Sequence, residues 1–104
     1  MVSVIIPVYN AEKTIGRAIK SIINQPYVHQ LILVNDASTD NSSSLISYFK
    51  DKYFSPDRGI KLDIIQLNSN EGVSVARNMG LEYVLSPFMT FLDADDEFLP
   101  RRFC

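Results

Sequence analysis

The stretch VSVIIPVYNAEKTIGRAIKSII, residues 2–23, changes the spacing of its apolar residues half-way along. Residues 2–8 are short, β-branched and almost wholly apolar, which is typical of a strand that is covered on both faces. One face of a helix then appears in the spacing of Ile15, Ala18, Ile19, Ile22 and Ile23. Asn10 is a suitable N-cap for this helix, and Pro26 lies just past its end. The stretch therefore predicts a β-strand followed by an α-helix.

The same alternation continues along the chain. Further strand-like runs occupy residues 31–34, 60–67 and 88–92, and helical spacing lies between them in residues 45–53 and 73–84. Residues 36–44 and 55–59 are polar and turn-forming. The order βαβαβαβ implies right-handed crossovers and a parallel sheet with helices on both faces. We therefore expect a Rossmann-like, three-layer α/β/α fold with a mostly parallel sheet, in a single domain over residues 1–104.

Composition excludes several classes of protein. A net charge of −2 excludes a nucleic-acid binder held mainly by bulk charge, so no nucleic-acid partner is expected. The apolar runs are too short and interrupted to predict a transmembrane segment, and no basic region precedes an apolar core at the N-terminus. The one cysteine, Cys104, predicts no internal disulfide. These features favour a cytoplasmic location.

Polar residues follow the predicted strands at their carboxyl ends, where open parallel sheets bind ligands. They are Tyr9-Asn10 after the first strand, Asn35-Asp36 after the second, and Asp93 to Asp95 after the fourth. The first strand is not followed by GxGxxG, and GxxxxGK[ST] is absent from the chain. A dinucleotide fingerprint or a P-loop is therefore not expected.

The acidic residues Asp93, Asp95, Asp96 and Glu97 follow directly on an apolar run. One interpretation is an acidic surface turn; the other is a site for Mg²⁺ or Mn²⁺, which prefer oxygen ligands and often bridge carboxylates to phosphates. An extended Asp-x-Asp segment places two carboxylates on the same side. An EF-hand is excluded because Phe98 stands where its loop needs glycine.

Single residues at the strand ends also have plain structural interpretations. Asp36, taken alone, could be a residue of a turn or a helix cap. Tyr9 could be an aromatic residue that only packs, and Arg77 could be a helix residue whose side chain reaches out to solvent. The pattern of the whole chain decides between these interpretations and a ligand site.

Four segments in order and register resemble the N-terminal half of family 2 glycosyltransferases, which have the GT-A fold. They are VSVIIPVYNAEKTIGRAIKSIINQ (2–25), LILVNDASTDNS (31–42), NEGVSVARNMGL (70–81) and FLDADDEFLP (91–100). The resemblance covers essentially the whole chain and favours the metal-site interpretation of the acidic residues. It implies a GT-A sheet that stops after the strand carrying the DxD motif.

The resemblance also implies residue roles on the donor side. Tyr9 stacks on the nucleotide base, with Pro7 and Val8 lining the site, and Asp36 bonds the edge of the base. Asn35 stands where many members of the family have a second acid. Arg77 faces the nucleotide.

For the DxD motif, the resemblance places Asp93 near the ribose, Ala94 beside it in the nucleotide-sugar site, and Asp95 on the divalent metal. The implied reaction is an inverting, metal-dependent transfer of a sugar from a nucleotide-diphospho-sugar, commonly a UDP-sugar, to a hydroxyl of a glycan or lipid-linked acceptor. Such enzymes serve cell-wall or polysaccharide biosynthesis, and a full-length parent is expected in the cytoplasm, peripheral to the inner face of the membrane.

The general base of such enzymes lies downstream of the DxD motif, and this sequence stops nine residues after Asp95. We therefore expect residues 1–104 to be the donor-binding half, without the acceptor-binding half, and to self-associate through an incomplete sheet edge. The alternative is a non-catalytic α/β module that binds nucleotide or acts through assembly. A phosphoacceptor receiver is disfavoured because it needs an acidic pair where Tyr9-Asn10 stand.

Overall fold

The computed structural model describes residues 2–54 and 59–93. Strands and helices alternate as expected from the sequence. Their bounds are β1 Val2–Val8, α1 Ile15–Ile23, β2 Val28–Asn35, α2 Ser42–Tyr53, β3 Lys61–Gln66, α3 Val73–Leu81 and β4 Phe88–Phe91.

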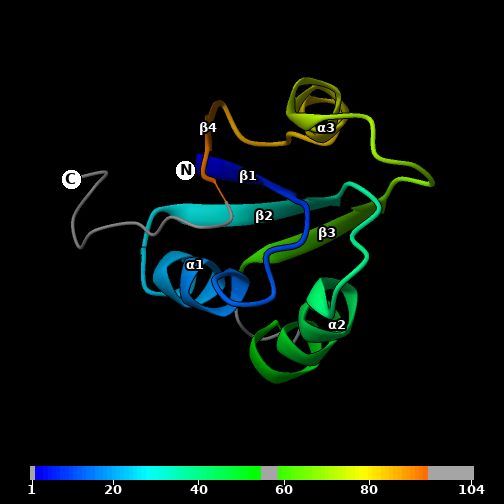
Figure 1. Ribbon diagram of the computed structural model, residues 1–104. Coiled ribbons are helices and arrows are strands. Elements are labelled where there is room, and N and C mark those ends of the chain that lie inside the picture. Colours follow the sequence, from blue (N-terminus) through cyan, green and yellow to red (C-terminus); the bar gives the residue numbers. More distant parts are fainter. Residues whose placement is uncertain (1, 55–58, 94–104) are drawn as a thin grey trace.

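The strands form one parallel sheet with the order β3-β2-β1-β4. Helices α1 and α2 lie on one face of this sheet and α3 lies on the other (Figure 1). The predicted three-layer α/β/α architecture with a parallel sheet is therefore confirmed. Pairing of Val8 with Asn35, and of Ile5 with Phe91, aligns the carboxyl ends of the strands at one edge.

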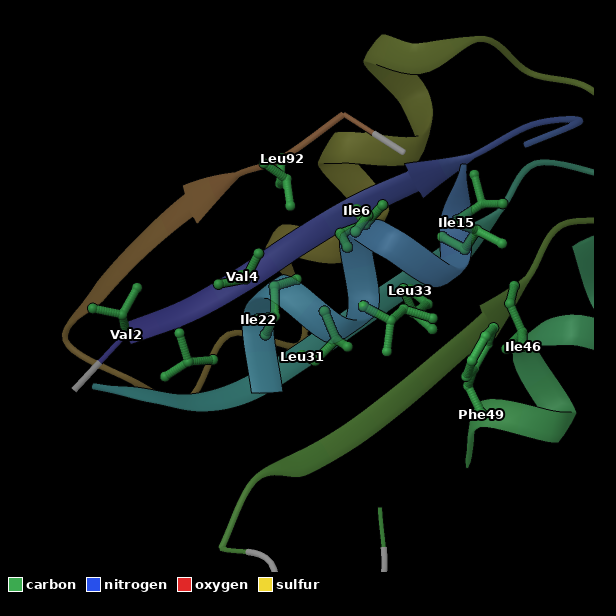
Figure 2. Packing of buried hydrophobic residues seen from close by; sticks show 14 residues of the cluster. Val2, Val4, Ile6, Ile15, Ile22, Leu31, Leu33, Ile46, Phe49 and Leu92 are labelled. Atoms are coloured by element: carbon green, nitrogen blue, oxygen red, sulfur yellow. The ribbon is translucent and has the colours of Figure 1, made fainter. Parts of the chain in front are cut away.

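Strand β1 lies in the middle of the core because both of its faces are covered. Val4 and Ile6 face α1 and pack in the larger apolar cluster, which also contains Ile22, as Figure 2 shows. Ile5 points to the opposite face and packs with Ala76 of α3. Each fully buried side chain of this size stabilises the fold by about 1.5–3 kcal/mol.

Glycine at position 80 allows α3 to approach β1 closely. A Cβ built on Gly80 would lie 2.5 Å from Cγ2 of Ile5, which is shorter than any ordinary contact between carbon atoms. The absent side chain therefore sets the spacing between α3 and the sheet, and with it the position of the loop that precedes α3.

The α3–β4 turn is fastened to the sheet by one buried amide, Gln30 of β2. Its Nε2 donates to the Tyr83 carbonyl oxygen and to Asp63 Oδ2, both at 2.7 Å. Its Oε1 accepts from Ser3 Oγ at 2.6 Å and from the Leu85 backbone N–H at 2.9 Å. All the hydrogen-bonding capacity of this amide is thus used at the amino-terminal edge of the sheet.

Two expectations about helix ends are wrong. Helix α1 begins at Ile15 with Thr14 at its N-cap position, not at Asn10, because Asn10 has a left-handed backbone (φ 49°) and bonds a neighbouring loop instead. Helix α3 ends at Leu81 and not near Val84, because Gln30 draws the chain at Tyr83 and Leu85 toward the sheet.

Within residues 2–54 and 59–93, no helix combines the length and the apolar character needed to cross a membrane.

Candidate functional site

The topology predicts where a ligand binds. From β1 the chain moves through β2 to β3 on one side, and it then returns to place β4 on the other side of β1. Loops that follow β1 and β4 therefore leave the sheet in different directions, and ligands of open α/β sheets bind in the crevice at such a switch point.

A pocket of about 850 Å³ lies at this position. It brings together the predicted site residues Pro7, Val8, Tyr9, Asp36 and Asp93. The pocket has the size of a typical small-molecule site. The fold thus gathers residues that are up to 86 positions apart in the sequence, and their roles toward a ligand stay predictions.

Tyr9 supplies the aromatic surface of the pocket. It follows β1 directly, and its side chain is 47% exposed, so part of the ring is open to solvent. Its neighbours are fixed, because the Val8 carbonyl oxygen accepts from Asp36 N–H at 2.8 Å and Asn10 N–H donates to Ser38 Oγ at 3.1 Å. An aromatic ring carried on a backbone that is held in this way can stack on a flat ligand.

Asp36 is almost fully buried, with 3% of its surface exposed. Its Oδ1 accepts from the Glu71 backbone N–H at 2.7 Å, and its Oδ2 accepts from the Gly72 N–H at 2.9 Å. Asp36 therefore ties the segment before α3 to the end of β2. Each carboxylate oxygen can still accept a further hydrogen bond, and contact with a nucleotide base stays a prediction for this residue.

Arg77 of α3 lies beside Asp93 and not in the pocket lining. Its Nη2 is 3.3 Å from Asp93 Oδ1, and its guanidinium lies 5.1 Å from the centroid of the Phe91 ring. The Arg77 Nε is buried and makes no hydrogen bond within the described part of the chain. Both charged side chains remain accessible, so this ion pair contributes little stability and leaves both groups available to a ligand.

The loops after β1 and β2 are joined side by side. Ala11 N–H donates to Ser42 Oγ at 2.9 Å, and Glu12 N–H donates to Asp40 Oδ2 at 3.1 Å. Asp40 Oδ1 also accepts from the Ser42 N–H at 2.8 Å. Desolvation raises the pKa of Asp40, but the hydrogen bonds from Ser42 and Glu12 outweigh it and leave this pKa below its usual value. The loops therefore form one wall of the pocket.

Sequence reasoning missed several residues of the pocket lining. They are Asn10, Ala11, Glu12, Lys13, Thr14, Asp40, Asn70, Gly72 and Val73. Two signals were present. Asn10 follows Tyr9 at the end of β1, and the segment NEGVSVARNMGL opens on Asn70 and Gly72, whose backbone φ of 94° suits glycine.

The predicted metal ligand Asp95, together with Ala94, Asp96 and Glu97, lies outside the described residues. Among the residues that the structure describes, no group of three or more histidine, cysteine or acidic side chains is placed to hold a metal ion. Asp93 fits the role of an oxygen ligand in part, because its carboxylate is 61% exposed and lines the pocket.

Comparison with known proteins identifies the family. The sequence model described as "Glycosyl transferase family 2" matches residues 3–104. The chain belongs to glycosyl transferase family 2. This match runs through the segments that form the pocket, from the end of β1 to the acidic residues after β4.

Relatives within family 2 are similar over nearly the whole chain. An uncharacterised glycosyltransferase of Haemophilus influenzae is 42% identical over 97 residues, which cover 92% of this chain and 36% of that protein. The Escherichia coli enzyme WfgD, named a UDP-Glc:α-D-GlcNAc-diphosphoundecaprenol β-1,3-glucosyltransferase, is 38% identical over 98% of this chain and 38% of its own. The chain thus spans little more than a third of the length of these family 2 relatives.

Solved structures show the same fold. Staphylococcus aureus TarS 1-349 in complex with UDP-GlcNAc has a TM-score of 0.78 and 30% identity, covering 92% of this chain and 27% of that chain. A Pyrobaculum calidifontis mannosyltransferase in complex with GDP-Man and Mn²⁺ has a TM-score of 0.85 at 24% identity, covering 96% of this chain and 29% of that chain. The GT-A fold expected for a family 2 protein is therefore confirmed.

Proposed function

We propose that this chain binds the donor of a family 2 glycosyltransferase reaction, a nucleotide-diphospho-sugar and specifically a UDP-sugar. The observation that carries the proposal is the pocket at the switch point of the sheet, which joins an exposed aromatic ring at Tyr9 to an exposed carboxylate at Asp93. The UDP-GlcNAc complex of TarS, at 30% identity, supports this donor class.

The residues divide the donor between them. Tyr9 stacks on the base, above the floor made by Pro7 and Val8, and Asp36 bonds the base edge while holding the backbone of Glu71 and Gly72. Arg77 faces the phosphates, which take the place of Asp93 as partner for its guanidinium. Asp93 then accepts from the ribose hydroxyls, and Ala94 lies beside it in the site.

The second part of the proposal is that donor binding depends on a divalent ion, Mg²⁺ or Mn²⁺. Asp95 binds this ion, and the diphosphate completes the oxygen ligands. When bound, the ion supplies a Lewis acid for the charge that develops on the diphosphate leaving group. The chain itself contributes the exposed Asp93 carboxylate and the joined loops that line the pocket.

We further propose that this chain is the donor half of an inverting transferase and that the general base comes from another segment. Asp36 and Asp40 line the pocket, but each carboxylate accepts a backbone N–H on both oxygens, and these bonds hold the loops of the donor site. A base must lie within hydrogen-bonding reach of the acceptor hydroxyl and take its proton, which would weaken such bonds. The names of relatives in teichoic acid and succinoglycan biosynthesis support a glycan acceptor, and the diphosphoundecaprenol in the name of WfgD supports a lipid-linked one.

Calorimetry of UDP binding, with Mn²⁺ and with EDTA, tests the proposal. We expect binding that is tighter with Mn²⁺, with Asp95→Ala removing the metal effect and Tyr9→Ala weakening binding in both conditions. Asp51→Ala, on the exposed side of α2, is the matched control for removing a carboxylate. Equal affinity with Mn²⁺ and with EDTA overturns the metal role.

Absence of UDP binding in either condition, by a chain that circular dichroism shows to be folded, overturns donor binding. It favours the alternative of an assembly module.

A further inference from the structure

We infer that Asn10 is a positioning residue for the base-stacking ring of Tyr9, an inference that rests on the nucleotide binding proposed above. Asn10 is exposed at the pocket rim and stands next to Tyr9 in the chain. It acts on the ligand through its neighbour, by fixing the backbone that carries the ring.

The side chain of Asn10 bridges two loops that are far apart in sequence. Its Oδ1 accepts from the Thr39 backbone N–H at 2.7 Å, the Thr39 hydroxyl at 3.3 Å and the Asp40 N–H at 3.3 Å. Its own backbone N–H donates to Ser38 Oγ at 3.1 Å. Asn10 therefore fastens the loop after β1 to the loop after β2 with four hydrogen bonds, beside the single bonds of Ala11 and Glu12.

This fastening acts on both sides of Tyr9. On one side, the Val8 carbonyl oxygen is held by Asp36 N–H at the end of the sheet. On the other side, the bonds of Asn10 hold the chain where it leaves the strand. The Tyr9 backbone is fixed at both ends, whereas its ring is left half-exposed toward the pocket.

Asparagine meets two demands at this position. The backbone of residue 10 is left-handed (φ 49°), a conformation that glycine and asparagine adopt more readily than other residues. The side chain must also present an acceptor to two backbone N–H groups. Glycine meets only the first demand. Aspartate meets both, but it adds a negative charge next to Asp40.

A ring that is fixed before the ligand arrives loses less conformational freedom on binding. Removing the Asn10 side chain should therefore weaken stacking of the nucleotide base on Tyr9 and leave the contribution of the metal ion to binding unchanged. For Asn10→Gly, which keeps the backbone conformation, we expect an affinity for UDP in EDTA about tenfold lower. The ratio of affinities with Mn²⁺ and with EDTA should stay unchanged. Asn10→Asp should lose less than Asn10→Gly.

A double-mutant cycle with Tyr9→Ala separates positioning from direct contact. If Asn10 acts through the ring, Asn10→Gly has no further effect on UDP affinity in the Tyr9→Ala background. Asn24→Ala, an exposed asparagine at the end of α1, is the matched control and should bind UDP like the unchanged chain. Fully additive losses in the cycle, or an Asn10→Gly chain that binds UDP normally, overturn the inference.

Amide hydrogen exchange of the ligand-free chain tests the same inference without any nucleotide. In Asn10→Gly, exchange at Ala11 and Glu12 should rise about tenfold, because their bonds to Ser42 and Asp40 depend on the joined loops. Core amides such as that of Ile5 should not change. A rise confined to Thr39, the direct donor, overturns the inference. Failure of the unchanged chain to bind UDP instead overturns the proposed function, while this exchange result still decides the role of Asn10.

Discussion

Ala37 follows Asp36 directly and has a left-handed backbone with φ of 56°. This conformation costs a residue with a Cβ about 1–2 kcal/mol, because the Cβ crowds the following carbonyl oxygen. The strain persists because the residues on either side are tied to other loops, Asp36 to Glu71 and Gly72 before α3, and Ser38 to Asn10 after β1. The wall of the pocket is thus held in a conformation that residue 37 by itself disfavours.

Replacing Ala37 by glycine should therefore stabilise the chain. The relief of strain is partly offset by the greater freedom of glycine in the unfolded state, so we expect the free energy of unfolding to rise by about 0.5–1 kcal/mol. Urea unfolding measures this change. Ala11→Gly is the control, since Ala11 does not have a positive φ, and it should lower stability. A fall in stability for Ala37→Gly would contradict the argument from strain.

Asp40 makes the joined loops sensitive to acid. Desolvation raises the pKa of Asp40, but hydrogen bonds from Ser42 and Glu12 together keep this pKa below the usual 3.8. Because the pKa is lowered on folding, the Asp40 carboxylate stabilises the folded loops at pH values above about 3.8. This stabilisation is lost as the pH falls through the lowered pKa of the folded state. The NMR shifts of the Glu12 and Ser42 amides should therefore move together below pH 3.8. They should not titrate in Asp40→Asn.

Single residues also show what a sequence can and cannot predict about a site. Tyr9, Asp36 and Asp93 were predicted to lie together because each comes at or just after the end of a strand, and the ends of parallel strands meet at one edge. Asn10 was assigned to a helix cap because that is the ordinary local role of asparagine. Its actual partner, Thr39, is 29 residues away, and local spacing carries no signal for such a bond.

Among the elements, β2 and α3 differ most in what the sequence revealed. The strand was expected from its apolar run, and the structure extends it to Val28–Asn35. The end of α3 was misplaced because Tyr83 and Val84 continue the helical spacing, whereas Gln30 binds the backbone around Tyr83. Gln30 precedes the predicted run of residues 31–34, and nothing in the sequence pattern indicated this role. Local sequence spacing cannot predict where a helix ends when a side chain far away in the sequence sets that end.

Replacing Gln30 by leucine should destabilise the chain by about 3 kcal/mol. The change removes the partner of the buried Ser3 hydroxyl and of the partly buried Tyr83 carbonyl and Leu85 N–H, and an unsatisfied buried group costs about 1–3 kcal/mol. Urea unfolding measures the loss. Gln66→Leu is the control, because Gln66 is exposed at the end of β3 and its Nε2 donates to the carbonyl oxygen of its neighbour Leu67. Equal stability of the two variants would show that the buried amide is dispensable.

At the scale of the whole molecule, the described sheet ends in β3 on one side and β4 on the other. Near β4, the side chains of Leu85 and Phe88 are 70% and 68% exposed. Such apolar surface next to a strand edge favours association between chains. We expect the molecular mass in sedimentation equilibrium to rise with concentration, and Phe88→Lys to reduce this rise. A monomer at every concentration would contradict self-association through this edge.

The last prediction concerns turnover, which needs more of the molecule than donor binding does. A sugar leaves its donor when charge on the diphosphate is stabilised, but the acceptor hydroxyl must also lose its proton to a positioned base. Among the described residues of the pocket, Asp36 and Asp40 each accept a backbone N–H on both carboxylate oxygens, and these bonds hold the loops of the donor site. Without a positioned base the reaction slows by about 10²–10⁴-fold, and loss of acceptor orientation slows it further.

We therefore expect residues 1–104 to bind UDP but to release none from UDP-sugars in response to mixed glycan and lipid-linked acceptors. Full-length WfgD from E. coli, assayed beside it with UDP-glucose, is the positive control. A rate of acceptor-dependent UDP release by this chain within about tenfold of the rate of WfgD would contradict the prediction, because loss of the base alone should slow the reaction more than this. It would place the base among residues 1–104.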